Sequence, residues 1–291
     1  MYDTGEQYHN NQRYADFEEN RYILIINDFV NYNRKHDQCK NTLFTILMVT
    51  GFLSAGAIIN FIPTWNLKTA DMNVLNGDWI NVYYETEKDA AEDVFAYADA
   101  ETAFIAERLG FKEKQDINVY IYDDQSTMQT KKYGYIAPLL GLDWYIGDNI
   151  GTEVILTSPA NPGEAHSYDD NKYAVLHEIV HAYISVINKD IDLWLTEGVA
   201  LYLSNGDPFY REYLEYFTLP TYEATTSDNP LTFSESGGYI VSHIYIEYLD
   251  QTYGWDKVLR LIETEDYEDC FGKSEKEIYE DWVHYISNYF Q

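Results

Sequence analysis

Residues 174–184 read AVLHEIVHAYI, with two histidines four positions apart, a glutamate after the first, and apolar residues at the other positions. Residues four positions apart lie on the same face of an α-helix, so His177 and His181 would direct two imidazole nitrogens to one point. Two such nitrogens can bind Zn²⁺ at about 2.0–2.1 Å, and the adjacent Glu178 can act as a general base. A core helix that happens to carry two histidines fits the same letters, so the remainder of the chain has to decide.

A further candidate ligand, Glu197, stands sixteen residues after His181, in the stretch LWLTEGVALYL (193–203). Residues 188–190 (NKD) favour a turn, after which a second helix can lie beside the first. A carboxylate on a largely apolar helix is costly to bury unless it is paired or binds a metal. A solvent-facing glutamate near a helix start is the alternative. Together with the two histidines, Glu197 is the expected third ligand of one catalytic zinc with an open fourth position.

The histidine-bearing helix has apolar residues at three- and four-residue steps, at Tyr173, Leu176, Val180, Tyr183 and Ile187. This spacing predicts one buried stripe, with the two histidines on the face left over. Burial of the helix and ligation of a metal are therefore compatible.

The chain as a whole is strongly acidic. It has 291 residues, is 46% hydrophobic and carries a formal net charge of −30. Its length and composition suffice for one sizeable core, or for two. The negative charge disfavours nucleic acid and anionic lipid as partners, because both are polyanions. Solubility outside a cell explains the acid excess, and attraction of basic substrates is the alternative.

Residues 42–62 read TLFTILMVTGFLSAGAIINFI and contain no charged side chain. As a helix of about 30 Å they would cross the hydrocarbon core of a membrane. Basic residues precede the segment at Arg34, Lys35 and Lys40, whereas Lys68 alone lies in the twenty residues after it. The positive-inside rule then puts residues 1–41 in the cytoplasm and the C-terminal part outside the cell, on a single-pass signal anchor. A buried soluble helix and a cleaved signal peptide are the alternatives.

The remainder is expected to be a short linker at 63–75 and an α+β domain at 76–291, with strands preceding helices. The expected strands are 79–84, 117–122 and 152–157, and residues 133–151 are expected to be largely loop. The expected helices are 88–109, one that begins at a cap among residues 169–171 and runs to about 187, 196–204, 208–217, 237–253, 255–264 and 275–289. Ser274 and Glu277 form the capping-box pattern of the last helix.

The stretches HEIVH (177–181) and WLTEG (194–198) resemble the gluzincin metallopeptidases, especially the thermolysin-like catalytic domains of the aminopeptidase-N clan. The resemblance covers about residues 77–291, a segment that is similar to short bacterial members of the peptidase-MA-like group. It implies a small mixed sheet followed by helices, with zinc between two helices. It also implies His177, His181 and Glu197 as zinc ligands, with Glu178 as catalytic base and proton shuttle.

The resemblance further implies that Tyr239 stabilises the oxyanion, since the related aminopeptidases have a tyrosine at the start of a helix there. A phenol near the metal can donate a hydrogen bond to an oxygen that becomes negative. A core tyrosine is the alternative reading, and His243, one turn later, is the substitute candidate.

Two departures from the aminopeptidase pattern bear on activity. The G-x-M-E-N signature that grips a free N-terminus is missing, and GTE at 151–153 is a partial counterpart, so an exopeptidase is not indicated. No carboxylate stands one turn after Glu197, so the partner of a zinc histidine has to come from elsewhere or be a backbone carbonyl.

These patterns predict a membrane-anchored zinc metallopeptidase that faces outward and cleaves within peptides or proteins, with strand 152–157 as an edge that pairs with an extended substrate. The alternative is a non-catalytic zincin-fold surface domain that binds or senses. The sequence does not name a substrate or an oligomeric state.

Overall fold

The computed structural model describes residues 31, 34–35, 40–204 and 218–289, and the chain divides into two compact units, Met1–Asn60 and Phe61–Gln291. The first unit contains the helix Lys40–Asn60, with 21 residues and a mean hydropathy of 2.0, none of it buried. By length and composition this helix is able to cross a bilayer, and it is the one such helix among the described residues.

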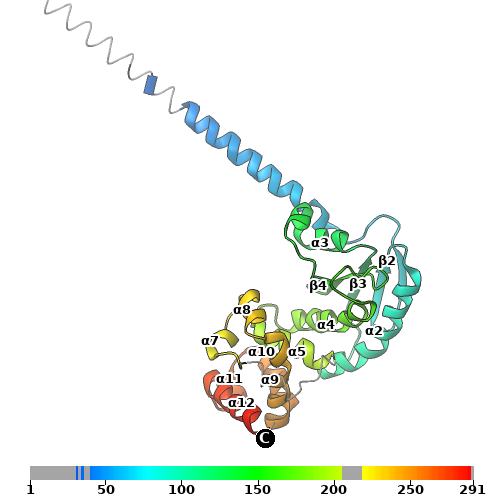
Figure 1. The fold of residues 1–291 in the computed structure, drawn as a ribbon, viewed down its shortest axis with the longest axis vertical. Coiled ribbons are helices and arrows are strands. Elements are labelled where there is room, and N and C mark those ends of the chain that lie inside the picture. Colours follow the sequence, from blue (N-terminus) through cyan, green and yellow to red (C-terminus); the bar gives the residue numbers. More distant parts are fainter. Residues whose placement is uncertain (1–30, 32–33, 36–39, 205–217, 290–291) are drawn as a thin grey trace, which may run out of the picture. The chain divides into compact units, whose positions relative to one another are not determined.

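The second unit begins with a five-stranded mixed sheet of order β1-β2-β3-β5-β4 (Figure 1). The strands are β1 (Asn73–Asn76), β2 (Ile80–Tyr84), β3 (Ile117–Tyr122), β4 (Gly147–Ile150) and β5 (Glu153–Thr157). β2, β3 and β5 run parallel, while β1 and β4 pair antiparallel at the two edges. The predicted α+β class, a small mixed sheet with helices after it, is thereby confirmed.

The prediction that strand 152–157 forms an edge is wrong. β4 covers β5 and is itself the edge strand, although its residues were expected to be loop. A tight turn at Gly151, where φ is +61°, joins the two strands into a hairpin. A short hairpin turn requires such a positive φ, which glycine adopts without strain. Gly151 therefore forms the turn of a hairpin in a stretch whose glycines, by sequence alone, indicate a loop.

Helices cover both faces of the sheet. On one face lie α2 (Lys88–Arg108) and α4 (Tyr168–Ile187), which share a core with alternate strand residues such as Val82, Val119 and Val154. On the other face α3 (Gln125–Tyr133) places Met128 against Tyr122. β3 is therefore buried on both sides, which explains why its sequence INVYIY lacks a polar alternation.

α4 is buried more widely than one stripe. Leu176, Val180 and Tyr183 are in the core as predicted, but Tyr173 is 49% exposed and packs edge-on against Tyr97. α4 contacts α2, β5, β4 and α5 at once, so several of its faces are covered. Its N-cap is Ser167, just before the residues expected to cap it, and Ser167 forms a capping box with Asp170.

The C-terminal half is helical. Its described helices are α5 (Leu193–Leu203), α7 (Tyr222–Thr225), α8 (Pro230–Glu235), α9 (Gly238–Tyr253), α10 (Trp255–Thr264), α11 (Tyr267–Phe271) and α12 (Glu275–Tyr289). The expected helix 208–217 lies outside the described residues. The Ser274–Glu277 capping box is present. α5 and α9 approach closely because Gly198 has no side chain: a Cβ there would lie 2.8 Å from the Ser242 carbonyl oxygen.

The segment 63–75, expected to be a linker, packs into the second unit. It contains most of the short helix η1 (Ile62–Trp65) and the start of β1. The Lys131 ammonium donates to the Asn66 carbonyl oxygen at 2.7 Å, and the Tyr122 hydroxyl donates to the Leu67 carbonyl oxygen at 2.7 Å. A second short helix, η2 (Gly134–Leu139), follows α3 and contacts η1.

Candidate metal centre

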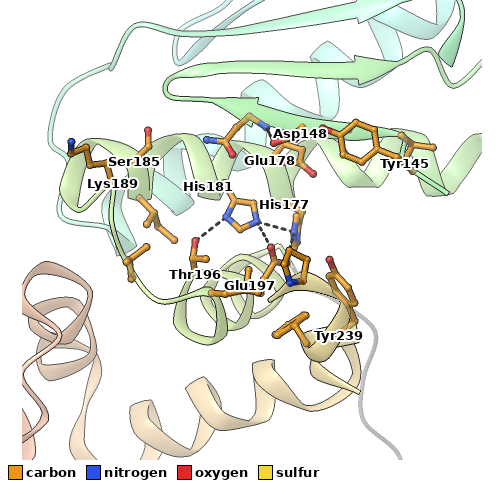
Figure 2. Close-up of a pocket in the computed structure, with 18 of the residues that line it drawn as sticks. Tyr145, Asp148, His177, Glu178, His181, Ser185, Lys189, Thr196, Glu197 and Tyr239 are labelled. Carbon is orange, nitrogen blue, oxygen red and sulfur yellow. Dashed lines mark hydrogen bonds and ion pairs between the residues drawn. The ribbon is translucent and has the colours of Figure 1, made fainter. Parts of the chain in front are cut away.

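Helices α4 and α5 bring three potential ligands together. His177 and His181 extend from one face of α4, and Glu197 extends from the α5 helix that packs beneath it (Figure 2). One ligand atom from each of the three residues lies within 4.8 Å of the other two. The predicted turn between the helices is present, since α4 ends at Ile187 and α5 begins at Leu193. Three residues predicted from spacing therefore do converge in space.

The distances among these atoms match the edges of a zinc coordination tetrahedron. The two Nε2 atoms of His177 and His181 lie 3.0 Å apart. Glu197 places Oε2 3.3 Å from His177 Nε2 and Oε1 3.5 Å from His181 Nε2. Ligand atoms at about 2.0–2.1 Å from a tetrahedral ion are about 3.3 Å from one another. Each carboxylate oxygen thus faces one histidine at a spacing close to that of zinc ligands, and one ligand atom from each of the three residues can be chosen within 4.8 Å of the others.

A buried carboxylate oxygen supports this fit. Glu197 Oε2 is buried, and its contact with His177 lacks the geometry of a hydrogen bond, so no hydrogen-bond donor reaches it. The charge on this buried oxygen needs a positive partner, which a metal ion or a protonated His177 at 3.3 Å can supply. The donor set of two imidazole nitrogens and one carboxylate oxygen is one that zinc commonly takes in catalytic sites.

The electrostatics of the cluster keep Glu197 ionised. Burial opposes its charge, but contact with His177 and the field of His181 outweigh burial and lower the pKa of Glu197. Burial together with the neighbouring His177 lowers the pKa of His181 to about 4, so its imidazole is neutral near pH 7. His181 and Glu197 are thus in the protonation states that bind metals. Burial opposes a charge on His177, but Glu197 and Glu178 outweigh it and raise the pKa of His177, so a metal ion has to displace a proton there.

Thr196 holds the second ring nitrogen of His181. Its Oγ1 lies 3.0 Å from His181 Nδ1 (Figure 2). When Nε2 binds a metal, Nδ1 carries the proton and donates it to the hydroxyl, which fixes both the tautomer and the ring orientation. The partner was expected to come from elsewhere in the chain or to be a backbone carbonyl, and the Thr196 hydroxyl was not identified from the sequence. Its position next to Glu197, on the helix that faces α4, was the available signal.

Glu178, the predicted base, is partly buried at the wall of the cavity. Its side chain lies against β4, where a Cβ on Gly147 would be 3.3 Å from Glu178 Cγ and 3.5 Å from its Oε1. Burial is the main cause that raises the pKa of Glu178 to about 8, and the carboxylates of Asp148 and Glu197 add to the effect. A carboxylate with a pKa in this range is able both to accept and to return a proton near neutral pH.

One cavity of about 530 Å³ contains the cluster. Its lining includes the three ligand candidates, Glu178, residues 146–149 of the β4 edge, and Tyr239 from the first turn of α9. The lining also includes the aromatic residues Tyr133, Trp144 and Phe233 and, from the α4–α5 connection, Asn188 and Ile191. The ligands thus sit in the floor of a cleft large enough for a peptide segment.

Of the two residues considered for oxyanion binding, Tyr239 lines this cavity and His243 is not among its described lining residues. The Tyr239 ring packs edge-on against Phe233 with 4.8 Å between centroids, which directs it into the cleft (Figure 2). Burial and the carboxylates of Glu197 and Glu178 raise the pKa of Tyr239 well above its ordinary value. The phenol therefore keeps its proton and remains a hydrogen-bond donor.

Asp148 is a cavity residue that the sequence argument did not identify, because it lies in the stretch expected to be loop. The β4 edge carries its carboxylate into the cavity, where it accepts a hydrogen bond from the Tyr145 hydroxyl and pairs with Lys132 Nζ at 2.9 Å. Glu153, the glutamate of the GTE stretch, accepts a hydrogen bond from the Asn118 amide at 3.3 Å and is not among the described lining residues.

Comparisons of the chain with protein-family models, with curated proteins and with solved structures found no match. The function of this protein therefore has to be inferred from its own side chains and their geometry.

Proposed function

We propose that this protein is a zinc-dependent metallopeptidase of the gluzincin type, with a thermolysin-like arrangement of its catalytic helices. The observation that carries the proposal is the convergence of His177, His181 and Glu197 at tetrahedral spacing in the floor of a cleft, with Glu178 in the same cavity. Three protein ligands leave a fourth position open, which distinguishes a catalytic zinc site from a structural one. When bound there, zinc supplies Lewis acidity and lowers the pKa of a water molecule to about 7.

Three of the protein's own residues transfer protons, stabilise the developing charge and orient a zinc ligand. Glu178 takes a proton from the attacking water and passes it to the amine that leaves when the peptide bond breaks. Tyr239 donates its hydroxyl hydrogen to the carbonyl oxygen as that oxygen becomes negative. Thr196 holds His181 so that its Nε2 keeps its direction throughout. Tyr239 acts in the protonated form that its surroundings favour, whereas Glu178, whose pKa is raised to about 8, has to lose its proton before it can act as the base.

An extended peptide fits along β4. This strand pairs with β5 on one side and is the outer strand of the sheet on the other, where a substrate strand can pair with it. At Asn149 the substrate would have to replace the hydrogen bonds that the carbonyl oxygen accepts from Lys132 Nζ and that the N–H donates to Asp148 Oδ1. Residues 147–149 of β4 line the cavity beside Glu178. A substrate paired there would run past the ligand cluster, which places a scissile bond within reach of the base.

Endopeptidase activity is the better supported mode. An exopeptidase needs a group that binds the free end of its substrate, such as an unpaired carboxylate for an amino terminus. Besides Glu178 and Glu197, the cavity lining includes the carboxylate of Asp148, but this carboxylate already pairs with Lys132 and accepts a hydrogen bond from Tyr145. The substrate is therefore expected to extend beyond the cleft in both directions.

The helix Lys40–Asn60 supports a membrane anchor for this enzyme. The basic residues Arg34, Lys35 and Lys40 precede it closely, which supports a cytoplasmic N-terminus and an outward-facing catalytic domain. Recovery of the protein in the membrane fraction after alkaline extraction is the expected result. Release into the soluble fraction would contradict the anchor and leave the zinc proposal intact.

The catalytic proposal is tested with the full chain in detergent micelles. We expect one zinc per chain by elemental analysis and cleavage of a mixed peptide library at internal bonds. Glu178→Gln should retain zinc and lose about 1,000-fold in cleavage rate, within the range that a general base contributes. Glu153→Gln, which changes a glutamate on β5 that hydrogen-bonds Asn118, is the matched control and should cleave as the parent does.

Two outcomes would contradict the proposal. If Glu178→Gln cleaves as fast as the parent, the assigned mechanism is wrong. If the parent binds zinc and cleaves nothing in the library, the alternative of a non-catalytic binding or sensing domain is supported.

A further inference from the structure

An apolar surface on η1 and η2 is exposed although both helices are packed onto the folded unit. Six of its side chains are between 45% and 83% exposed: Ile62, Trp65, Tyr135, Ile136, Leu139 and Leu140. η1 and η2 contact each other, and both contact α3 (Figure 1). We refer to these six side chains as the η1–η2 surface. Large apolar groups left exposed on two short helices that contact each other point to a site of interaction with a protein or a membrane.

The surface is held in place by its supporting residues. The Lys131 ammonium, on α3, binds the Asn66 carbonyl oxygen just after η1. Gly134 and Ala137 on η2 are buried, so that helix is pinned on one side while the other presents apolar groups. The exposure of Leu139, at 83%, therefore belongs to the folded arrangement.

The chain around this surface is free of acidic residues. Residues 61–70 and 125–142 contain no Asp or Glu, although the whole chain contains 49. The net charge of −30 disfavours contact with lipid phosphates for the molecule as a whole, and this surface is the local exception. Lys68 lies in one of the two acid-free stretches and brings a positive charge. The charge pattern fits a phosphate-bearing partner.

Chain continuity indicates which partner this is. Ile62 follows the last residue of the helix Lys40–Asn60 by two positions, and that helix is able to cross a bilayer. Trp65 and Tyr135 are of the two residue types that gather at the headgroup level of membranes, where an apolar ring meets a polar surrounding. An apolar, acid-free surface tethered this closely to a membrane helix meets the bilayer before it meets other surfaces.

We propose that the η1–η2 surface inserts into the headgroup region of the bilayer in which Lys40–Asn60 is anchored. Tyr133 and Trp144 flank η2 on either side in the sequence, and both line the cleft. Insertion therefore places one rim of the cleft near the lipid surface. If the proposed peptidase function holds, on which this consequence rests, the substrates are polypeptide segments that lie close to a membrane.

The insertion is tested with the full chain reconstituted in zwitterionic phosphatidylcholine vesicles. In a Cys39→Ser background, Leu139→Cys is labelled with an environment-sensitive dye, while the native Cys270 is buried and unlabelled. Vesicles with a nitroxide in the upper acyl chain should remove about half of the dye fluorescence, since interfacial groups enter about 5–10 Å. Phe104→Cys is the matched control: Phe104 is 51% exposed on α2, across the sheet from α3, and its dye should keep its fluorescence.

A second label at Tyr135→Cys, 61% exposed on η2, should behave as the Leu139 label does. The proposal is overturned if the dyes at 135 and 139 are quenched no more than the dye at 104, or if the full chain does not float with vesicles. It is also overturned if the dyes on separate copies of one variant quench one another while lipid does not quench them, because a second copy of the chain then covers the surface. None of these readouts involves zinc or hydrolysis, so they remain informative if the proposed function fails.

Discussion

The site between α4 and α5 and the surface on η1 and η2 depart from ordinary residue placement in opposite directions. The site keeps ionisable groups inside: Glu178 and Glu197 lie at the wall and floor of a buried cleft, next to two histidines. The surface keeps apolar groups outside, with Leu139 and Trp65 mostly exposed. Each arrangement costs stability in water, and each would be relieved by a different proposed partner, a cation in one case and a lipid interface in the other.

A buried charge or an exposed apolar side chain indicates function most clearly when its neighbours hold it in place. Glu197 is held by the close packing of α5 on α9 at Gly198, and Leu139 by the buried anchor residues of η2. Neither can relieve its cost by moving away. Substitutions should therefore have different effects in the two regions. At the site between α4 and α5 they should greatly weaken ligand binding, and on the η1–η2 surface they should change stability only slightly.

The largest effect is expected for Glu197→Gln. The amide supplies no negative charge to the cluster, so zinc affinity should fall by more than about 1,000-fold, since loss of an outer hydrogen-bond partner alone costs 10–100-fold. Competition with a chelator measures this affinity. Glu153→Gln, outside the lining of the cleft, is the control and should bind zinc as the parent does. Equal affinities for the Glu197 variant and the parent would remove Glu197 from the ligand set.

Tyr239→Phe is expected to lower kcat by about 100-fold, with little change in KM, because the hydroxyl acts on charge that develops only in the transition state. Steady-state cleavage of a library-derived peptide measures both constants. Tyr173→Phe is a matched control, since Tyr173 is 49% exposed and Tyr239 is 48% exposed, but Tyr173 packs against Tyr97 on α2. A loss confined to KM would assign Tyr239 to substrate binding.

Thr196→Val should weaken zinc binding by about 10-fold, because the second ring nitrogen of His181 loses its acceptor. Thr196→Ser keeps the hydroxyl and should restore most of the affinity. The same chelator competition measures both variants. If valine and serine behave alike, the hydroxyl does not orient His181.

The smallest effect is expected on the η1–η2 surface. Leu139→Ala should change the free energy of unfolding by no more than about 0.5 kcal/mol, as for exposed positions generally. Leu195→Ala on α5, where the leucine is 1% exposed, should cost about 2–5 kcal/mol through the cavity it leaves. Urea unfolding in micelles, followed by tryptophan fluorescence, compares the two. A similar loss in the free energy of unfolding for both variants would show that Leu139 packs internally and is not part of an exposed surface.

Much of the candidate site could be predicted because its signals are local. The spacing of His177 and His181 is a property of any α-helix, and the apolar setting of Glu197 is visible in the letters around it. β3 and α10 were located at their observed bounds for the same reason, since hydrophobic period and flanking glycines act within a few residues.

The errors occurred where distant segments decide the outcome. β4 was expected to be loop because its glycines dominate locally, yet pairing with β5 makes it an edge strand. Tyr173 fits the helical stripe by spacing, but the cover that α2 provides leaves it half exposed. Thr196 and Asp148 gained roles only when other elements approached them, namely α4 in one case and Lys132 of α3 in the other.

By itself the sequence determined the α+β class, the apolar helix near the N-terminus, and the residues that converge between α4 and α5, because periodicity, charge and helical spacing operate over short range. Tertiary structure alone decided which strand is the edge, which hydroxyl holds His181, and that η1 and η2 combine into one exposed apolar surface. These features depend on contacts between segments far apart in the chain. No local pattern specifies such contacts, because their free energy arises only when the packed elements meet.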